Sequence, residues 1–310
     1  MTDLIILGSV NLDVVLRVRA LPKPGETIAT RSVDQFLGGK GANQAVSASR
    51  SGAETMFHAC VGDDAQGEWL ISELQGHSVS VERIGIEAGE RSGRAYVCVD
   101  DAGENHIVLE AGANNLLKLD QAVSKSSRVV LSQLETPIST TRKFFLSALD
   151  AGVKTVLNAA PAVFEARTGL FPLADILVVN ESELAFYAGV DRIPEDIEDI
   201  TRIARALISR EGQVIIVTCG AAGALAISLT GFDVTPARRT RAKDTTGSGD
   251  CFCGALCARL SMGDDLSTAM QYASVAASLS VEKEGAAASM PSRTDVELII
   301  FEMQPEEIPG

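Results

Sequence analysis

Glycines, hydroxyls and carboxylates concentrate in residues 243–255, whose sequence is KDTTGSGDCFCGA. Gly247 and Gly249 permit backbone conformations in which successive N–H groups point the same way and can bind an anion. A helix is predicted to begin at about Gly249, so its positive end would face the same point. Because a carboxylate there would repel phosphate, Asp250 is either a favourable first-turn charge on the helix or a base that accepts a proton from an attacking hydroxyl.

A second glycine-rich stretch, residues 36–52, reads FLGGKGANQAVSASRSG. It is not a Walker A loop, because Gly41 rather than Ser or Thr follows Lys40, and Gln44 replaces the third glycine of a dinucleotide fingerprint. The glycines either let the N-terminus of a helix pack closely or hold Asn43 at the mouth of a tight loop. The second interpretation suits hydrogen bonding to a polyhydroxylated ligand, since an amide both donates and accepts.

Polar side chains also follow the predicted strands. Asn11 and Asp13, in GSVNLD, lie just past the first strand, where open α/β sheets bind ligands, and they either grip adjacent sugar hydroxyls or form a turn. Asn180 and Glu183, in VVNESE, share one helix face and either suit Mg²⁺ through water beside a nucleotide or cap the helix. Glu135, in QLETP, lies at another strand end.

A fourth segment, residues 217–224, reads VTCGAAGA and ends a predicted strand. Thr218, Gly220 and Gly223 are small enough to let a flat base or a phosphate approach the backbone closely. By itself this pattern indicates a nucleotide loop only weakly.

The chain has 310 residues, of which 46% are apolar, and its net charge is −14. This composition supports a large core and argues against nucleic-acid binding. The N-terminal apolar run is too short to span a membrane and no basic leader precedes it, so we expect a cytoplasmic protein with no membrane partner.

Six cysteines lie in apolar or small-residue segments, and without a secretion signal free thiols are favoured over disulfides. Cys251, Cys253 and Cys257 suggest a zinc site only faintly, because no histidine lies near them and their spacing is wrong.

Short apolar runs alternate with helical patterns, which predicts a doubly wound α/β fold with a mostly parallel central sheet flanked by helices. The predicted core strands are 3–8, 54–61, 128–132, 154–158, 175–179 and 213–218. The predicted helices are 40–51, 66–75, 138–150, 181–188, 196–210, 249–261, 265–283 and 293–302. Residues 14–37 and 92–110 interrupt this rhythm with strand-like patterns, and they form either one small sheet that covers an edge of the main sheet or two surface hairpins.

Taken in order, these segments resemble the ribokinase family, the sugar kinases of the phosphofructokinase-B type. The resemblance rests on GSVNLD, LPKPGET, GGKGANQA, GENHIVLEAGAN, QLETP, NAAPA, NESE, VTCGAAGA and DTTGSGD, which cover nearly the whole chain. It implies a ribokinase-like α/β domain made of residues 1–13, 38–91 and 111–310, and a β-sheet lid made of residues 14–37 and 92–110. In relatives the lid often supplies a dimer interface, so a homodimer through the lid is expected.

The resemblance also implies roles for individual residues. Asp250 would be the catalytic base, with backbone N–H groups of Gly247, Ser248 and Gly249 facing the transferring phosphoryl. The sugar site would be lined by Asn11, Asp13, Gly39, Lys40, Asn43 and Glu135. The ATP site would include Asn180, Thr218, Gly220, Gly223, Ser248 and Gly249, with Asn180 and Glu183 tied to Mg²⁺. A monovalent cation, usually K⁺, would be held at Asp244, Thr246, Ser280, Lys283, Gly285 and Ser289.

The expected activity is therefore ATP-dependent phosphorylation of a primary hydroxyl of a small sugar, with O5 of D-ribose as the favoured acceptor. Ser248, where ribokinases usually carry alanine, and Cys253, where asparagine is common, depart from the family pattern. The alternatives are a sister kinase for a nucleoside such as pseudouridine, for deoxyribose or for another sugar, and a sugar-binding regulator without catalysis. A Rossmann dehydrogenase is disfavoured because no proper dinucleotide fingerprint exists.

Overall fold

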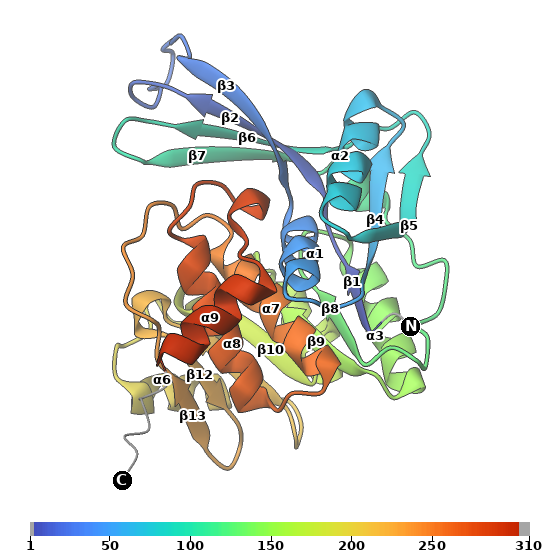
Figure 1. The fold of residues 1–310 in the computed structure, drawn as a ribbon, viewed down its shortest axis with the longest axis vertical. Coiled ribbons are helices and arrows are strands. Elements are labelled where there is room, and N and C mark those ends of the chain that lie inside the picture. The colour runs from blue at the N-terminus through green and yellow to red at the C-terminus, as the bar shows by residue number, and fades with distance from the viewer. Residues whose placement is uncertain (1–2, 304–310) are drawn as a thin grey trace.

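A large mixed sheet forms the centre of the molecule (Figure 1). Residues 3–303, which the computed structural model describes, place nine strands in the order β13-β12-β11-β10-β9-β8-β1-β4-β5. The strands are β1 Leu4–Leu7, β4 Thr55–Gly62, β5 Ser80–Glu87, β8 Val129–Ser132, β9 Lys154–Asn158, β10 Ile176–Asn180, β11 Val214–Thr218, β12 Ala224–Ile227 and β13 Phe232–Thr235. All neighbouring pairs from β5 to β11 are parallel, whereas β12 and β13 are antiparallel additions at one edge.

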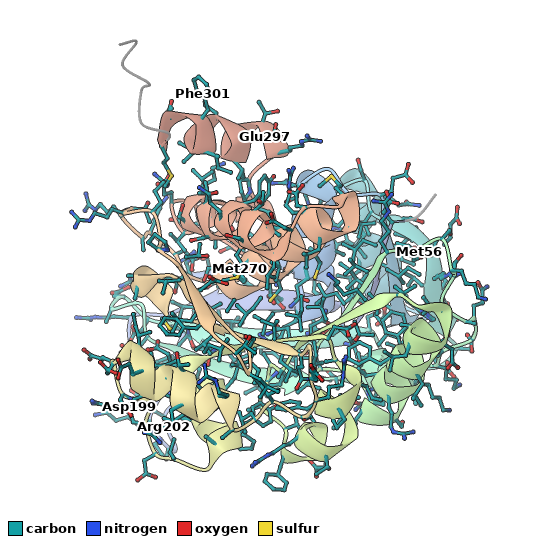
Figure 2. All side chains as sticks on the ribbon, turned by 90° about the horizontal axis from the view of Figure 1, so that it is seen from below. Met56, Asp199, Arg202, Met270, Glu297 and Phe301 are labelled. Atoms are coloured by element: carbon teal, nitrogen blue, oxygen red, sulfur yellow. The ribbon has the colours of Figure 1, made fainter. Side chains whose placement is uncertain are left out.

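Helices cover both faces of this sheet. One face carries α1 Lys40–Arg50, α2 Ala65–Gly76, α7 Ser248–Met262, α8 Leu266–Ser280 and α9 Arg293–Met303. The other carries α3 Ile138–Ala151, α4 Phe164–Gly169, α5 Glu181–Ala188 and α6 Ile197–Arg205, with the short turns η1 Gly112–Leu116 and η2 Phe171–Leu173. In Figure 2, Met270 points from α8 toward the sheet, while α6 with Asp199 and Arg202 lies on the opposite side.

The apolar runs of the central strands follow from this layering. Leu4 and Ile6 of β1 enter the core below α1 and α7, whereas Ile5 and Leu7 enter the core below α3. A strand covered on both faces reads as a continuous apolar run, which is the pattern that predicted these strands.

The chain reverses direction across the sheet at β1. After β1 it adds β4 and β5 on one side, and later it adds β8, β9, β10 and β11 on the other side. In open α/β sheets ligands bind outside the carboxyl ends of the strands at such a switch point, here between β1 and β8.

A smaller sheet projects from the carboxyl ends of the central strands (Figure 1). Its order is β3-β2-β6-β7, with β2 Asn11–Arg17, β3 Ser32–Gly38, β6 Gly93–Val99 and β7 Asn105–Glu110. The lid that the sequence predicted is therefore present as one sheet rather than two separate hairpins. Its strands include Asn11, Asp13 and Gly38, which the sequence had assigned to the main domain.

Asn114 joins two of the four places where the chain passes between the lid and the main domain. Its side chain accepts from the backbone N–H of Val10 at 3.0 Å and donates to the Val10 carbonyl at 3.1 Å. It also donates to Oδ1 of Asn11 at 2.8 Å. Asn114 is buried, so both connections are held by one amide.

Two predicted helices are shorter in the structure. The helix predicted over 196–210 ends at Arg205, because the N–H of Ser209 donates to the side chain of Gln213 at 2.7 Å instead of to a helical carbonyl. The helix predicted over 265–283 ends at Ser280, since the carbonyl of the next residue accepts from the N–H groups of Lys243 and Asp244.

The sequence also missed strands β5, β12 and β13, which lie at or next to the edges of the sheet, and the short helix α4, which follows β9. Residues 1–2 and 304–310, which belong to the predicted main domain, lie outside the described residues. Within residues 3–303, no helix has the length and apolar character needed to span a membrane.

Helices α1 and α7 pack closely at Gly254. A Cβ added to Gly254 would lie 2.4 Å from the carbonyl oxygen of Gln44 and 2.6 Å from Cβ of Ser47. We therefore expect Gly254→Ala to lower the free energy of unfolding by about 1–3 kcal/mol, as overpacking of a core does. Chemical denaturation measures this change.

The matched control is Gly76→Ala at the end of α2, where an added Cβ meets no atom within 4 Å. Alanine favours a helix, so this variant should be neutral or more stable by up to about 1 kcal/mol. Equal losses in the two variants would contradict the close packing of α1 on α7.

Candidate active site

Asp250 lies in the first turn of α7, and its carboxylate is held by two amides from α1. Asn43 Nδ2 donates to Oδ2 at 3.0 Å, and Gln44 Nε2 donates to Oδ1 at 2.9 Å. Asp250 is only 6% exposed, so both of its oxygens have partners inside the protein. The first-turn N–H groups of α7 lack partners within the helix and form a positive end beside this carboxylate.

Asn43 has one polar atom left over. Its Oδ1 is buried and has no hydrogen-bond partner within residues 3–303, although its Nδ2 is engaged by Asp250. A buried acceptor of this kind is costly unless a donor arrives from outside. The hydroxyl of a bound ligand would supply that donor beside the Asp250 carboxylate.

Glu135 joins the ends of β8, β1 and α1. Its Oε2 accepts from the hydroxyl of Ser9 at 2.5 Å and from the N–H of Lys40 at 3.0 Å. Ala42 N–H donates to the carbonyl of Ser9 at 2.9 Å. Gly41 allows this contact, because a Cβ there would lie 2.6 Å from the backbone nitrogen of Ser9. The N-terminus of α1 is thereby fixed at the switch point of the sheet.

Asp13, from the lid strand β2, faces this group of charges. Burial, together with repulsion from Glu135 and Asp250, raises the pKa of Asp13 to about 7. A carboxylate in this environment gains from a ligand that donates hydroxyl hydrogens to it. The lid therefore contributes a polar group to the same site as α1 and α7.

Lys40 supplies the positive charge of the site. Attraction by Asp250 raises the pKa of Lys40, burial lowers it, and Glu135 and Glu183 raise it further. The net shift is upward, so Lys40 stays protonated among these three carboxylates. The structure thus brings together the residues that the sequence suggested for a sugar site and places them next to Asp250.

Asn180 and Glu183 form a reciprocal cap at the start of α5. Asn180 Oδ1 accepts from the N–H of Glu183 at 2.8 Å, and Glu183 Oε2 accepts from the N–H of Asn180 at 2.9 Å. The capping that the sequence offered as one interpretation is thus present. Burial raises the pKa of Glu183, and Lys40 lowers it. Only one carboxylate oxygen of Glu183 serves the cap, so the other can face a ligand.

The loop after β11 is tight and made of small residues. Cys219 N–H donates to the carbonyl of Gly223 at 2.8 Å, which closes the short turn η3, Gly220–Ala222. Gly223 has a φ of 106°, which favours glycine, and a Cβ there would lie 2.1 Å from the carbonyl oxygen of Thr235. Thr218, at the end of β11, is partly buried. No hydrogen bond of the described residues ties this loop to Asp250.

Asp244 connects the loop before α7 to the loop after α8. Its Oδ1 accepts from the N–H of Thr246 and its Oδ2 from the N–H of Gly285, both at 2.9 Å. Burial raises the pKa of Asp244, but these hydrogen bonds outweigh it, so the pKa lies below its usual value. Asp244, Thr246 and Gly285 are therefore adjacent, as the sequence suggested.

The other three residues of the predicted cation site are arranged differently. The hydroxyls of Ser280 and Ser289, on α8 and in the turn η4, Ala287–Ser289, donate to the carbonyls of Ala277 and Ala286, and Lys283 is exposed. These residues can reach a cation through their hydroxyl or backbone oxygens, but the lysine side chain cannot act as a ligand.

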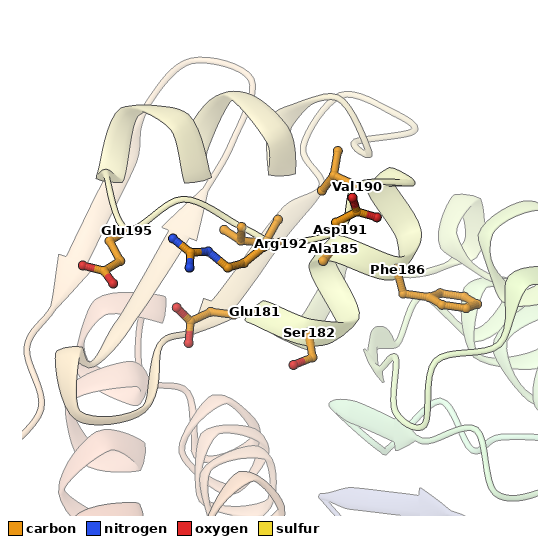
Figure 3. Close-up of a pocket in the computed structure, with 9 residues that line it drawn as sticks. Glu181, Ser182, Ala185, Phe186, Val190, Asp191, Arg192 and Glu195 are labelled. Carbon is orange, nitrogen blue, oxygen red and sulfur yellow. The ribbon is translucent and has the colours of Figure 1, made fainter.

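A hollow of about 520 Å³ lies along the outer side of α5 (Figure 3). Its lining includes Glu181, Phe186 and Arg192, and in Figure 3 Arg192 lies between the carboxylates of Glu181 and Glu195. It contains none of the residues that the sequence proposed for a site, and the chemistry gathers instead around Asp250.

Sequence reasoning missed several polar residues that hold the site in place. Ser9, Gln44, Asn114, Gln133 and Asn158 are buried and hydrogen-bonded to predicted site residues or to one another. In the sequence, Gln44 stood out only because it replaces the third glycine of a dinucleotide-binding fingerprint. The available signal was the polarity of Gln44 and Gln133 in segments that were otherwise apolar or small.

Comparison with known proteins gives consistent matches over nearly the whole chain. The sequence pattern described as pfkB family carbohydrate kinase matches residues 1–293. The chain is 33% identical to a ribokinase of Haemophilus influenzae, over 94% of this chain and 96% of that protein. It is 31% identical to a deoxyribokinase of Salmonella typhi, over 94% and 96%. It is also 33% identical to a bifunctional ribokinase/ribose-5-phosphate isomerase A of Fructilactobacillus sanfranciscensis, over 98% of this chain but only 57% of that protein.

Solved structures agree with these sequence matches. A ribokinase from Cryptococcus neoformans in complex with ADP superposes with a TM-score of 0.83 at 31% identity and covers 96% of this chain and 100% of that chain. An Arabidopsis thaliana ribokinase complexed with ribose and ATP superposes with a TM-score of 0.87 at 28% identity and covers 96% and 98%.

The raised pKa of Asp13 predicts a pH dependence of stability. The folded-state pKa of about 7 lies above the ordinary value of 3.8, so the folded protein keeps a proton between these pH values that the unfolded chain has lost. The stability contributed by this proton is present at low pH and is lost as pH rises through about 7. Asp13→Asn should therefore gain stability over the wild type between pH 5 and pH 8, by on the order of 2 kcal/mol.

Denaturant unfolding at pH 5 and pH 8 measures this difference, with Asp34→Asn on the neighbouring lid strand as the control. Parallel pH curves for Asp13→Asn and the wild type would show that Asp13 does not titrate in this range.

Proposed function

Since this chain belongs to the pfkB family of carbohydrate kinases, we propose that it transfers the γ-phosphoryl group of ATP to a primary hydroxyl of a small sugar, O5 of D-ribose in the first place. The observation that carries this proposal is the buried Asp250 carboxylate at the N-terminus of α7, beside the unpartnered Oδ1 of Asn43. This arrangement supports a base, and an acceptor for the sugar hydroxyl, next to a helix end that favours anions.

In this proposal Asp250 takes the proton of the attacking hydroxyl. The backbone N–H groups of Gly247, Ser248 and Gly249 face the phosphoryl group as negative charge moves on its oxygens. Ser248 N–H donates to the carbonyl of Thr245 at 3.2 Å, a long bond that a phosphate oxygen would have to replace. Most of the acceleration would come from positioning and electrostatics, as in other phosphoryl transfers.

The sugar would lie between the lid and the N-terminus of α1. Asn11 and Asp13 would bind hydroxyls from the lid side, while Asn43, Glu135 and the backbone at Gly39 and Lys40 would bind them from below. This arrangement is supported by the burial of Asn11, by the raised pKa of Asp13 and by the partnerless Oδ1 of Asn43. Closure of the lid would exclude water and limit hydrolysis of ATP.

We assign the nucleotide to the small-residue loop that follows β11 and includes Thr218, Gly220 and Gly223. Oxygen atoms of Asn180 and Glu183 suit Mg²⁺ held through water, because one carboxylate oxygen of Glu183 is not used by the cap. When bound, Mg²⁺ balances charge on the phosphate oxygens.

The monovalent cation site is proposed at the loops joined by Asp244. The residues are Asp244, Thr246, Ser280, Lys283, Gly285 and Ser289, with Lys283 contributing only its backbone. The low pKa of Asp244 supports this assignment, since a carboxylate that stays ionised suits a cation. A K⁺ ion there would fix the loop that begins α7.

The cytoplasm is the proposed location. All six cysteines are free and lie within the described residues, which suits a reducing compartment.

Removing the proposed base tests the mechanism. Asp250→Asn should lower sugar-dependent formation of ADP at least about 100-fold, because general-base catalysis contributes that much or more. A coupled ADP assay measures the rate, and circular dichroism checks folding. The control is Asp264→Asn at the other end of α7, which removes an ion pair with Arg259 but lies outside the site. Near wild-type turnover in folded Asp250→Asn would rule out this residue as the base.

A substrate panel tests the acceptor. D-ribose, 2-deoxyribose, other pentoses and hexoses, and pseudouridine should be compared with and without K⁺, and we expect the highest kcat/KM for ribose in the presence of K⁺. Higher kcat/KM for deoxyribose or pseudouridine would assign the sister activity, for which the 31% identity to a deoxyribokinase is the present support. Absence of turnover with every sugar would favour a sugar-binding regulator.

The outer face of the lid is proposed as a homodimer interface. Residues that pair directly across the sheet share a face, so Val14, Tyr96 and Val108 lie opposite to the face of Asp13. Tyr96 is 37% exposed and Val108 is 67% exposed, and Val33 on the same face is 52% exposed. A second copy of the lid would cover this apolar surface.

We therefore expect a dimeric mass in solution for the wild type and a monomeric mass for Val108→Glu, because a buried charge would oppose association. Light scattering after size-exclusion chromatography measures both. Ile107→Glu is the control, since Ile107 is adjacent and similarly exposed but lies on the face of Asp13. A wild-type monomer, or a dimer that tolerates Val108→Glu, would contradict this interface.

A further inference from the structure

Gln44 lies at the centre of a buried chain of amides that ends at Asp250. Its Nε2 donates to Oδ1 of Asp250 at 2.9 Å and to Oδ1 of Asn158 at 3.0 Å. Its Oε1 accepts from Nε2 of Gln133 at 2.6 Å. Gln44 is completely buried, so it cannot contact a ligand from solvent.

The partners of Gln44 determine which way its amide points. On one side are two acceptors, the carboxylate of Asp250 and the carbonyl oxygen of Asn158, and on the other side is a donor from Gln133. A flipped amide would place its oxygen against both acceptors and its NH₂ against the donor. A carboxylate can only accept, so Asp250 requires the NH₂ group of Gln44 on its side, and the Gln133 amide donates to the Gln44 oxygen on the other side.

Gln133 is in turn confined by the strand next to it. A Cβ on Gly8 would lie 2.1 Å from Oε1 of Gln133, so this glutamine fills the space that the side chain of residue 8 would occupy. Oε1 of Gln133 has no hydrogen-bond partner within residues 3–303. Burying this oxygen without a partner costs free energy, and the one hydrogen bond of the Gln133 side chain within the described residues goes to Gln44.

The neighbouring residues Asn43 and Gln44 thus serve different oxygens of Asp250. Asn43 binds Oδ2 and keeps an unpartnered oxygen for a ligand, so its hydrogen bonds change when a ligand enters. Gln44 binds Oδ1 and has no free polar atom, so its hydrogen bonds do not need to change.

We infer that Gln44, hydrogen-bonded on its other side by Gln133, is a positioning residue that holds Oδ1 of Asp250 so that Oδ2 faces the reacting hydroxyl. The inference rests on the proposed function in one respect, the role of Asp250 as the base. It adds that α1 carries both a ligand-binding amide and a fixed amide in adjacent positions.

Other charged groups also face Asp250. Lys40 on α1 attracts the carboxylate, whereas Asp13 on β2 and Glu183 on α5 repel it. Cys251 and Cys253, in the turn of α7 that follows, remain neutral because burial raises the pKa of both thiols. A variant at Gln44 changes none of these charges.

A double-mutant cycle in unfolding free energy tests the contact without any assay of activity. Gln44→Met keeps the length of the side chain and removes its polar atoms, and Asp250→Asn removes the charge. We expect Gln44→Met to cost more stability when residue 250 is Asp than when it is Asn, since a hydrogen bond to a charged acceptor is the stronger one. The loss of bonds to Asn158 and Gln133 is common to both backgrounds and cancels. Equal costs would overturn the inference.

Kinetics supply the second measurement. In Gln44→Met, kcat should fall by about 10–100-fold while the sugar KM changes less than about threefold, because a base that is slightly misplaced costs rate rather than binding. The acid limb of kcat/KM against pH should move to higher pH, since the ionised carboxylate has lost a donor. Gln133→Leu should show the same changes in weaker form. An unmoved acid limb together with unchanged kcat would also overturn the inference.

Ser47→Ala is the matched structural control. Ser47 Oγ donates to the carbonyl of Cys251 at 2.7 Å, so it joins the same two helices without touching Asp250. It should lower stability and leave kcat and the pH profile unchanged. If the wild type shows no sugar-dependent turnover at all, the proposed function fails, and the unfolding cycle still decides whether Gln44 holds Asp250.

Discussion

The hydrogen bonds from α1 to the buried carboxylate of Asp250 are the constraint around which the molecule is arranged. A charge with so little exposure is tolerated only where donors and a helix N-terminus stabilise it. The donors reach Asp250 because Gly254 lets α1 and α7 approach closely, and α1 begins at the switch point because Gly41 lets it touch β1. The close packing of α1 against α7 and β1 therefore also sets the geometry of the site.

The central part of the fold was predictable because its signals are local. Strands buried on both faces read as apolar runs, and glycines followed by small residues mark the starts of α1 and α7. Strands β5 and β13 were missed because these edge strands are only partly buried and lack such runs. Strand β12 is fully buried, and its run of four residues was not recognised. The end of α8 was missed because it depends on hydrogen bonds from Lys243 and Asp244, which come from a distant part of the chain.

The site residues also differ in how far the sequence could identify them. Residues that resemble a family motif, such as Asp250 and Asn43, were identified from the sequence together with their proposed roles. Gln44 and Gln133 were not, because a glutamine carries no intrinsic indication of its partner, and these two are 89 positions apart. Asn180 and Glu183 allowed both a cap and a metal ligand, and the structure shows that the cap leaves one carboxylate oxygen over for the other role.

The amide of Asn114 has a mechanical consequence. The lid is connected to the main domain by separate stretches of chain, and this side chain clamps the start of β2 to the turn that follows β7. Two of the four crossings between the lid and the main domain are thus tied together at one point. Asp13 lies only two residues beyond this tie, so any rotation of the lid about it would displace the Asp13 carboxylate less than the tip of the lid.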